Sequence, residues 1–167
     1  MRLTILTTGG TIDKTYDEFQ GSLRNTRTVL DVLLGTLRIP DLFVRHLEVM
    51  HKDSLDMTVE DRETIADSVS GALPTSDAVI ILHGTDTLAL TGEHLCRTIA
   101  EPQIPVILTG AMRPYEFRDS DALQNVTEAL LAARILDGGF YVVMHNRVLS
   151  FPGVVKDRRA LTFVRKD

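Results

Sequence analysis

Three stretches of this sequence place hydroxyl, carboxylate and amine side chains close to runs of apolar residues. They are Thr7-Thr8-Gly9-Gly10-Thr11 after Leu3–Leu6, Thr85-Asp86-Thr87 after Ala78–Leu82, and Lys156 in the stretch FPGVVKD. A threonine hydroxyl is a weak nucleophile at neutral pH and needs a base or a polarising partner. Thr11 is therefore a candidate nucleophile, and Lys156 could supply the base if burial favours its neutral form.

The residues around these threonines have both a chemical and an ordinary interpretation. Gly9-Gly10 permits backbone geometry that larger residues resist, and it lets a substrate approach the main chain. Thr85 and Asp86 lie near the start of a predicted helix, where backbone N–H groups favour negative charge. Taken alone, Thr85-Asp86-Thr87 is equally well explained as a helix N-cap.

Other catalytic and binding patterns are missing from the sequence. It contains neither GxGxxG nor GxxxxGK[ST], so nucleotide binding has little support, and it contains no GxSxG nucleophile turn. Its five histidines do not have the spacing of a known metal site; they are His46, His51, His83, His94 and His145. The single cysteine, Cys96, excludes an intrachain disulfide, and its apolar surroundings predict a buried, inert thiol.

The elements that must position these residues alternate between two kinds. Apolar runs predict strands at Leu3–Leu6, Leu42–Val49, Ala78–Leu82, Val106–Leu108 and Tyr141–Met144. Between them, apolar residues with helical spacing predict helices at Val29–Leu37, Ile65–Leu73, Leu88–Ile99 and Leu123–Ala133. The second helix follows a capping box at Thr58–Asp61, and the fourth follows a cap at Asp119 or Ser120. This alternation predicts a single α/β domain with a mostly parallel sheet and helices on both faces, of the flavodoxin or Rossmann-like type.

Polar loops follow each predicted strand. In chain order they are TTGGT, HKDSLDM, HGTDT, TGAMRP and HNRVL. Ligands of open α/β sheets bind outside the carboxyl ends of the strands, so we expect these loops to meet at one edge. Ordinary turn chemistry also explains polar loops, so their composition alone does not prove a site.

Composition excludes several classes of partner. The chain has 167 residues, 44% of them hydrophobic, which fits one globular domain. Its net charge of −5 argues against a nucleic-acid surface. It shows neither a long apolar run nor a signal-peptide pattern, so we expect no membrane partner and a cytoplasmic location.

Five motifs in chain order resemble those of the bacterial-type L-asparaginase family. They are Thr8-Gly9-Gly10-Thr11-Ile12, Ser54-Leu55-Asp56-Met57, His83-Gly84-Thr85-Asp86-Thr87, Thr109-Gly110-Ala111-Met112-Arg113-Pro114 and Val155-Lys156. Five matches in order are far more specific than any one. The resemblance is to compact members that comprise only the N-terminal domain, so we expect residues 1–167 to form one catalytic domain without a C-terminal domain.

The resemblance implies catalytic roles for five residues. Thr11 matches the nucleophile of the first motif, and Tyr16 would be the tyrosine of a mobile loop that helps to activate it. Thr85 matches the second threonine, Asp86 the aspartate that holds the α-amino group of the substrate, and Lys156 the lysine coupled to Thr85. The spacing from Thr11 to Tyr16 is shorter than in longer members, so a plain loop tyrosine is the alternative.

The same resemblance implies a set of substrate-binding residues, in which Ser54 holds the α-carboxylate and Ala111 lies beside the scissile amide. The set is Gly10, Asp53, Ser54, Gly84, Thr85, Asp86 and Ala111. Leu55 departs from the family, where glutamine is common, and we expect its apolar side chain to narrow the pocket and to favour asparagine over glutamine.

The implied activity is hydrolysis of L-asparagine to L-aspartate and ammonia without a metal or other cofactor. Longer members contribute C-terminal residues to a partner's site; without them we expect an open site, weaker affinity and a homo-oligomer, either a dimer or a tetramer. Two alternatives stay open at this point. One is an amidase acting on glutamine or on a glutamyl carrier such as tRNA, and the other is a non-catalytic amino-acid-binding domain.

Overall fold

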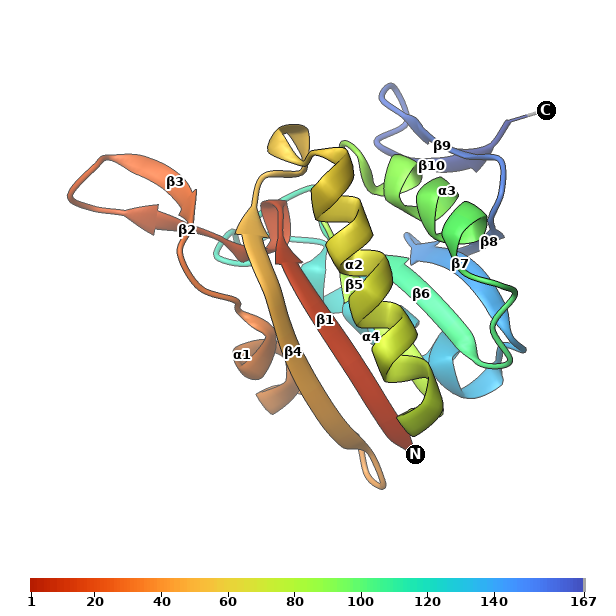
Figure 1. Cartoon of the computed structure of the whole chain (residues 1–167). Helices are drawn as coiled ribbons and strands as arrows, with labels where there is room; N and C mark the ends of the chain where they lie inside the picture. The colour runs from red at the N-terminus through yellow and green to blue at the C-terminus, as the bar shows by residue number, and fades with distance from the viewer. Residues whose placement is uncertain (167) are drawn as a thin grey trace.

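A six-stranded sheet forms the centre of the molecule in the computed structural model, which describes residues 1–166 (Figure 1). Its strand order is β4-β1-β5-β6-β7-β8. The strands are β1 (Arg2–Gly9), β4 (Phe43–Lys52), β5 (Ala78–Leu82), β6 (Pro105–Thr109), β7 (Gly139–Met144) and β8 (Arg147–Ser150). All neighbours are parallel except β7 and β8, so the predicted mostly parallel α/β sheet is confirmed.

The order of the parallel strands places a crevice between β1 and β5. Counted along the chain without the hairpin strands, the order is second, first, third, fourth, fifth, which is the flavodoxin arrangement. In that arrangement the connections after the first and third strands leave in opposite directions, and ligands bind there. The loops that begin at Gly10 and His83 therefore flank the crevice.

The central strands follow from continuous apolar runs. Every residue of β5 and of β6 is buried, as expected for parallel strands covered on both faces. The five predicted strands all exist, and the run Ala78–Leu82 coincides with β5. The antiparallel edge strand β8 was not predicted, because RVLS has too few apolar residues to stand out.

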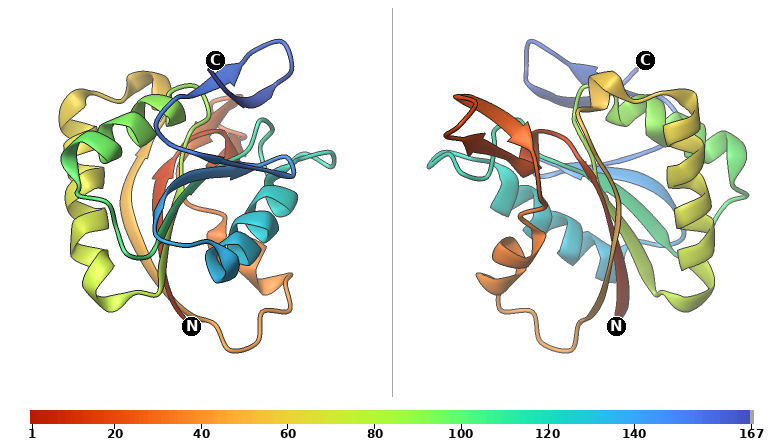
Figure 2. Two further views of the ribbon diagram at one scale, coloured as in Figure 1. Left: turned by 90° about the vertical axis from the view of Figure 1, so that its right-hand side faces the viewer. Right: turned by 60° about the vertical axis from the view of Figure 1, so that its left-hand side comes forward.

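Helices cover the two faces of the sheet, as predicted (Figure 2). On one face α2 (Val59–Ala72) and α3 (Leu88–Thr98) pack on a cluster that includes Leu6, Ile81 and Leu108. On the other face α1 (Leu30–Gly35) and α4 (Ala122–Ile135) pack on a cluster that includes Ile5, Ile80 and Ile107. Successive residues of a strand thus point into the hydrophobic clusters on opposite faces of the sheet, as expected for a pleated strand.

The helix ends test two predicted caps. The capping box of α2 is confirmed, since the Thr58 hydroxyl accepts the Asp61 N–H and the Asp61 carboxylate accepts the Thr58 N–H. The cap of α4 was predicted at Asp119 or Ser120, but the N-cap residue is Asp121. The Ser120 hydroxyl still accepts the N–H of Ala122 at 3.1 Å. The Asp121 carboxylate is turned towards the preceding loop instead.

Two short hairpins were not predicted. One is formed by β2 (Lys14–Asp17) and β3 (Ser22–Asn25), and the other by β9 (Val154–Asp157) and β10 (Thr162–Arg165). Both lie towards the end of the molecule where the parallel strands have their carboxyl ends (Figure 1). Each of their strands is four residues long and has at most two apolar residues, so the strands carry little hydrophobic periodicity.

The rest of the described chain adds three one-turn 3₁₀ helices, η1 (Thr11–Asp13), η2 (Ser54–Asp56) and η3 (Leu73–Thr75). Across residues 1–166 no helix combines the length and apolar character needed to cross a membrane. Cys96 is partly exposed rather than buried, contrary to expectation. Partial burial, together with the charge of Glu93, raises its pKa to about 11, which disfavours the reactive thiolate.

Candidate active site

Two glycines bring the loops after β1 and β5 into direct contact. Gly10 has φ +84°, and a Cβ added there would overlap the backbone of Gly84. A Cβ on Gly84 would in turn lie 2.6 Å from the Cβ and Oγ of Ser54, which begins η2. Three loops therefore meet at the crevice, and each carries a predicted site residue beside the contact. These residues are Thr11, Ser54 and Thr85.

The threonines around Gly9-Gly10 divide into two kinds. Thr7 Oγ1 lies 2.9 Å from His46 Nε2, and Thr8 Oγ1 donates to the carbonyl oxygen of Leu82 at 2.9 Å. Both side chains are buried. The Thr11 side chain is partly exposed, and its hydroxyl makes no hydrogen bond with any residue from 1 to 166. Thr7 and Thr8 hold the turn, whereas the Thr11 hydroxyl remains available to a ligand.

Lys156 is brought to the loop after β5. Its Nζ donates to Thr85 Oγ1 at 2.8 Å and to Asp86 Oδ1 at 3.0 Å. Lys156 lies on β9 opposite Phe163 of β10, and the Phe163 side chain is buried in the core. The C-terminal hairpin therefore anchors the lysine, whose side chain is only 13% exposed.

The buried side chain of His83 fixes the loop after β5 through two hydrogen bonds. His83 Nδ1 lies 2.8 Å from the carbonyl oxygen of Gly84, and Nε2 lies 2.8 Å from Thr91 Oγ1 on α3. Because a carbonyl can only accept, Nδ1 carries the proton and Nε2 accepts from the threonine. Complete burial lowers the pKa of His83 to about 4, so the ring is neutral at physiological pH.

The loop after β6 is held by residues that the sequence reasoning missed. The Asp121 carboxylate accepts the N–H groups of Met112 and Arg113 at 3.0 Å and lies 2.7 Å from His145 Nε2. Asn125 joins this carboxylate to the carbonyl oxygen of Gly110. Burial tends to raise the pKa of Asp121, but the bonds from Met112 and His145 outweigh it and lower the pKa. The Asp-x-x-x-Asn spacing, one helical turn, was the available signal.

Ser54 and Asp53 are placed differently from each other. Ser54 is buried, and its Oγ accepts the Thr87 N–H at 3.4 Å while its carbonyl oxygen accepts the Thr87 hydroxyl at 2.7 Å. Asp53 caps η2 through the Leu55 N–H and receives Lys14 Nζ at 2.5 Å. Burial opposes the shift, but these hydrogen bonds lower the pKa of Asp53. Asp53 thus secures the loop and the β2–β3 hairpin.

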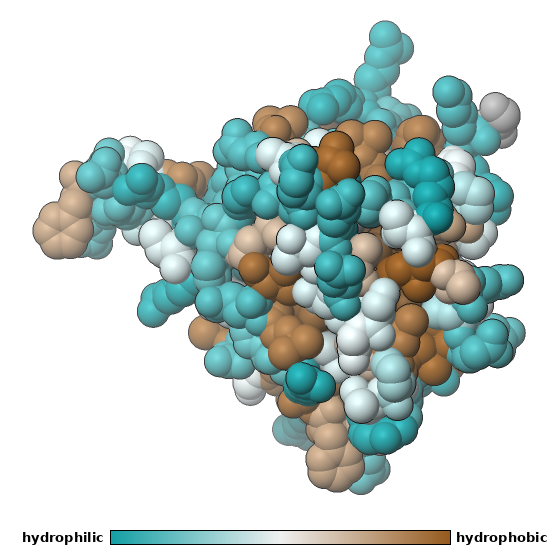
Figure 3. All heavy atoms as spheres, in the orientation of Figure 1, coloured by the Kyte–Doolittle hydropathy of each residue, from teal (hydrophilic) through white to brown (hydrophobic). Residues whose placement is uncertain are grey.

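The Tyr16 side chain makes no hydrogen bond with Thr11 or with any other residue from 1 to 166. It is 57% exposed on β2, and its backbone N–H donates to Glu116 Oε2 at 2.7 Å. Its hydroxyl lies near Gly21, in the turn of the hairpin. The hairpin stands out from the body of the molecule as a mainly hydrophilic arm (Figure 3).

Two further expectations concern the walls of the site. Leu55 is 65% exposed on η2, so it does not narrow an enclosed pocket, contrary to the sequence-based expectation. Ala111 is fully buried behind the loops, next to Gly110, where a Cβ would overlap the carbonyl oxygen of His83. Within residues 1–166, histidine, cysteine, aspartate and glutamate do not gather in threes in a way that could hold a metal ion.

The arrangement can support nucleophilic catalysis. An available hydroxyl on Thr11 lies one residue from the Gly10–Gly84 contact, and Thr85, on the other side of that contact, is hydrogen-bonded to an amine. The Asp86 carboxylate, 26% exposed, can receive a cationic group from solvent. These are the parts needed to orient a small zwitterion and to attack one of its carbonyl carbons.

Comparisons with known proteins agree on one family. The family model described as "Asparaginase, N-terminal" matches residues 2–159. L-asparaginase of Thermococcus kodakarensis is 35% identical over 149 residues, which are 89% of this chain and 45% of that protein. A glutamyl-tRNA(Gln) amidotransferase component of Methanosphaera stadtmanae is 32% identical over 149 residues, which are 86% of this chain and 33% of that protein.

Solved structures give the same result. The thermostable L-asparaginase from T. kodakarensis superimposes with a TM-score of 0.90 at 34% identity, covering 99% of this chain and 51% of that one. A probable cytoplasmic L-asparaginase from Campylobacter jejuni has a TM-score of 0.80 at 28% identity, covering 98% of this chain and 51% of that one. The chain spans about half the length of these L-asparaginases, and about a third of the amidotransferase component.

Proposed function

The chain belongs to the asparaginase N-terminal family, and on that premise we propose that it hydrolyses L-asparagine to L-aspartate and ammonia with Thr11 as the nucleophile. The observation that carries the proposal is the contact of Lys156 with Thr85 and Asp86, at the crevice where the Thr11 hydroxyl is available. The chain spans about half the length of the asparaginases that it matches, so the proposed activity is that of this chain and not of a longer protein.

Substrate binding relies on the two ends of the zwitterion. In this proposal Asp86 receives the α-ammonium group and the Ser54 hydroxyl binds the α-carboxylate. Gly10 and Gly84 have no side chains, so the amide can approach the main chain between them. Holding both ends fixes the side-chain amide against Thr11 and reduces the entropy cost of the attack.

The reaction proceeds through an ester. Thr11 Oγ1 forms a bond to the amide carbon, its proton passes to the leaving nitrogen, and the C–N bond breaks to release ammonia. A backbone N–H, that of Thr85, stabilises the negative oxygen. Water then attacks the ester carbon, gives up a proton through Thr85 and Lys156, and frees aspartate and the Thr11 hydroxyl.

Lys156 can take part as a base only in its neutral form. The Asp86 carboxylate lies 3.0 Å from its Nζ. In this scheme a substrate ammonium bound to Asp86 offsets that negative charge.

A second candidate activity is hydrolysis of glutamine or of a glutamyl group on a carrier. It is supported by the similarity to components of glutamyl-tRNA(Gln) amidotransferases. The net charge of −5 disfavours a tRNA-bound substrate for this chain. A domain that only binds an amino acid would need Asp86 and Ser54 but not the Lys156–Thr85 contact, so that alternative is less well supported.

The quaternary and cellular context follow as proposals. We expect a homo-oligomer, a dimer or a tetramer, in which another surface covers the open site, and a cytoplasmic location. Sedimentation of the purified chain would measure the first. A monomer with full activity would contradict the need for a covering protomer.

The deciding experiment measures ammonia released from L-asparagine and from L-glutamine by the purified chain at neutral pH. We expect release from asparagine, and none from the Thr11→Ala variant. Release from glutamine alone would replace the substrate. Binding of aspartate without any ammonia release would favour the binding domain.

A further inference from the structure

A second cation lies beside the carboxylate that is proposed to hold the substrate ammonium. Arg158 Nη1 is 3.5 Å from Asp86 Oδ1, the same oxygen that receives Lys156 Nζ at 3.0 Å. Building on the proposed function, we propose that Arg158 is a specificity-determining residue that weakens recognition of the substrate α-ammonium group. The ligands affected are small dicarboxylates and their amides that carry a free α-amino group.

Asp86 is surrounded by positive charge. One carboxylate already faces an ammonium and a guanidinium, so a substrate ammonium becomes the third cation around one negative charge. Lys156 is well buried and held by Thr85, so it stays in place. Arg158 is 71% exposed, so it is the cation that the ligand must displace or approach. Either event weakens binding of an ammonium, and a ligand without an ammonium does not bear this cost.

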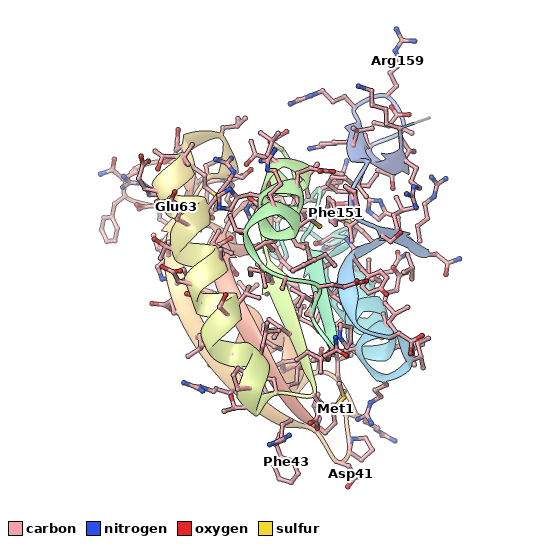
Figure 4. All side chains as sticks on the ribbon, turned by 45° about the vertical axis from the view of Figure 1, so that its right-hand side comes forward. Met1, Asp41, Phe43, Glu63, Phe151 and Arg159 are labelled. Carbon is pink, nitrogen blue, oxygen red and sulfur yellow. The ribbon has the colours of Figure 1, made fainter. Side chains whose placement is uncertain are left out.

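Arg158 and the next residue, Arg159, lie in the β9–β10 turn and point in different directions. Asp157 Oδ1 accepts the N–H groups of Arg159 and Ala160 at 2.8 and 3.0 Å, which fixes the turn. Arg159 points away from the molecule into solvent (Figure 4). Within residues 1–166 its side chain forms no ion pair or hydrogen bond. Of these two adjacent arginines, only Arg158 forms an ion pair with Asp86 within residues 1–166.

The size of the effect is limited by exposure. Exposed ion pairs contribute between zero and about 1 kcal/mol, which corresponds to at most about fivefold in binding. The effect must also fall as salt is added, because screening weakens interactions between exposed charges. A small, salt-sensitive preference against α-ammonium groups is the predicted signature.

The test compares two ligands that differ only in the amino group. L-aspartate and succinate are titrated calorimetrically into the full chain, into Arg158→Gln and into Arg159→Gln at low ionic strength. Succinate corrects for any loss of attraction between Arg158 and the ligand carboxylates. We expect the ratio of the Kd for aspartate to the Kd for succinate to fall about twofold to fivefold in Arg158→Gln. Arg159→Gln should leave that ratio unchanged, and added salt should bring the unmodified chain closer to Arg158→Gln.

The proposal is overturned if the ratio stays the same or rises in Arg158→Gln, if Arg159→Gln lowers it equally, or if neither ligand binds any of the three proteins. The readout is binding and requires no turnover. A chain that releases no ammonia from asparagine would refute the proposed reaction, while the ratio of Kd values would still decide the role of Arg158.

Discussion

Lys156 Nζ lies 2.8 Å from Thr85 Oγ1, although the two residues are 71 positions apart along the chain. The lysine is on the C-terminal hairpin and the threonine follows the central strand β5. In a sequence that contains Lys156-Asp157-Arg158-Arg159, a solvated lysine paired with Asp157 would be an ordinary expectation. The 3.0 Å contact with Asp86 instead gives the lysine a partner in the candidate site.

Lys156→Met should lower kcat by two or more orders of magnitude, in line with the roughly 10²–10⁴-fold contribution of a general base. Lys156→Arg should be nearly as damaging, because a guanidinium does not give up its proton. The fold should survive both changes, and steady-state ammonia release together with thermal unfolding checks this. A fully active Lys156→Met enzyme would remove the lysine from the mechanism.

Thr11→Ala should abolish turnover with little change in stability, because the Thr11 hydroxyl makes no hydrogen bond within residues 1–166. Thr8→Ala is the matched comparison, since it leaves the carbonyl oxygen of Leu82 without its buried donor. We expect that change to lower the free energy of unfolding by about 1–3 kcal/mol. Urea unfolding and ammonia release, measured on both variants, separate the two roles. Near-normal turnover by Thr11→Ala would make Thr85 the next candidate nucleophile.

Gly10→Ala should cost both stability and activity. The position has φ +84°, and a Cβ would overlap the backbone of Gly84, so the two loops must separate. Gly71→Ala is the control, because Gly71 lies on α2 with open space around its Cβ position. Alanine there should stabilise the helix by about 0.5–1 kcal/mol. Equal unfolding midpoints for the two variants would contradict the close packing of the crevice.

Stability should decrease as the pH falls from about 6.5 towards 4 because of His83. Its pKa is about 4 in the folded protein, against 6.5 as its ordinary value, owing to burial. Above pH 6.5 the ring is neutral in both states and contributes no pH dependence. Below pH 6.5 the His83 ring of the unfolded chain binds a proton, whereas the buried ring of the folded chain stays neutral. The free energy of unfolding therefore falls, by roughly 3 kcal/mol near pH 4.

Two measurements check the His83 prediction. Urea unfolding at several pH values should show a slope in this range that is absent from His83→Gln. NMR titration of the folded protein should show that the His83 ring stays neutral down to about pH 4. A ring that titrates near pH 6.5 would show that it is not isolated from water.

Local patterns in the sequence were sufficient for the fold class. The buried strands β5 and β6 are uninterrupted apolar runs, and the α2 capping box is a four-residue signal, so short-range physics predicts both. The polar loops follow the strands, and parallel strands bring their carboxyl ends to one edge. The sequence therefore predicts that these motifs lie together.

The tertiary structure decided what depends on contacts between distant residues. Strand order set the β1–β5 crevice, and only packing shows that Gly10 lies against Gly84. The hairpins were not predicted because strands of four residues with at most two apolar side chains are too short to show a hydrophobic periodicity. Tyr16 is accordingly found on an exposed arm.

The roles of the side chains also divide into those determined by the sequence and those decided by the tertiary structure. The sequence by itself determined which loops carry hydroxyl, carboxylate and amine groups, because residue type and position after a strand are local properties. The tertiary structure decided which partner each group meets. The Asp121 carboxylate binds the backbone of the Met112 loop and does not cap its own helix. Arg158, but not Arg159, contacts Asp86. The physical reason is that hydrogen bonds and ion pairs act over a few ångströms, and only the folded chain brings residues 70 positions apart within that range.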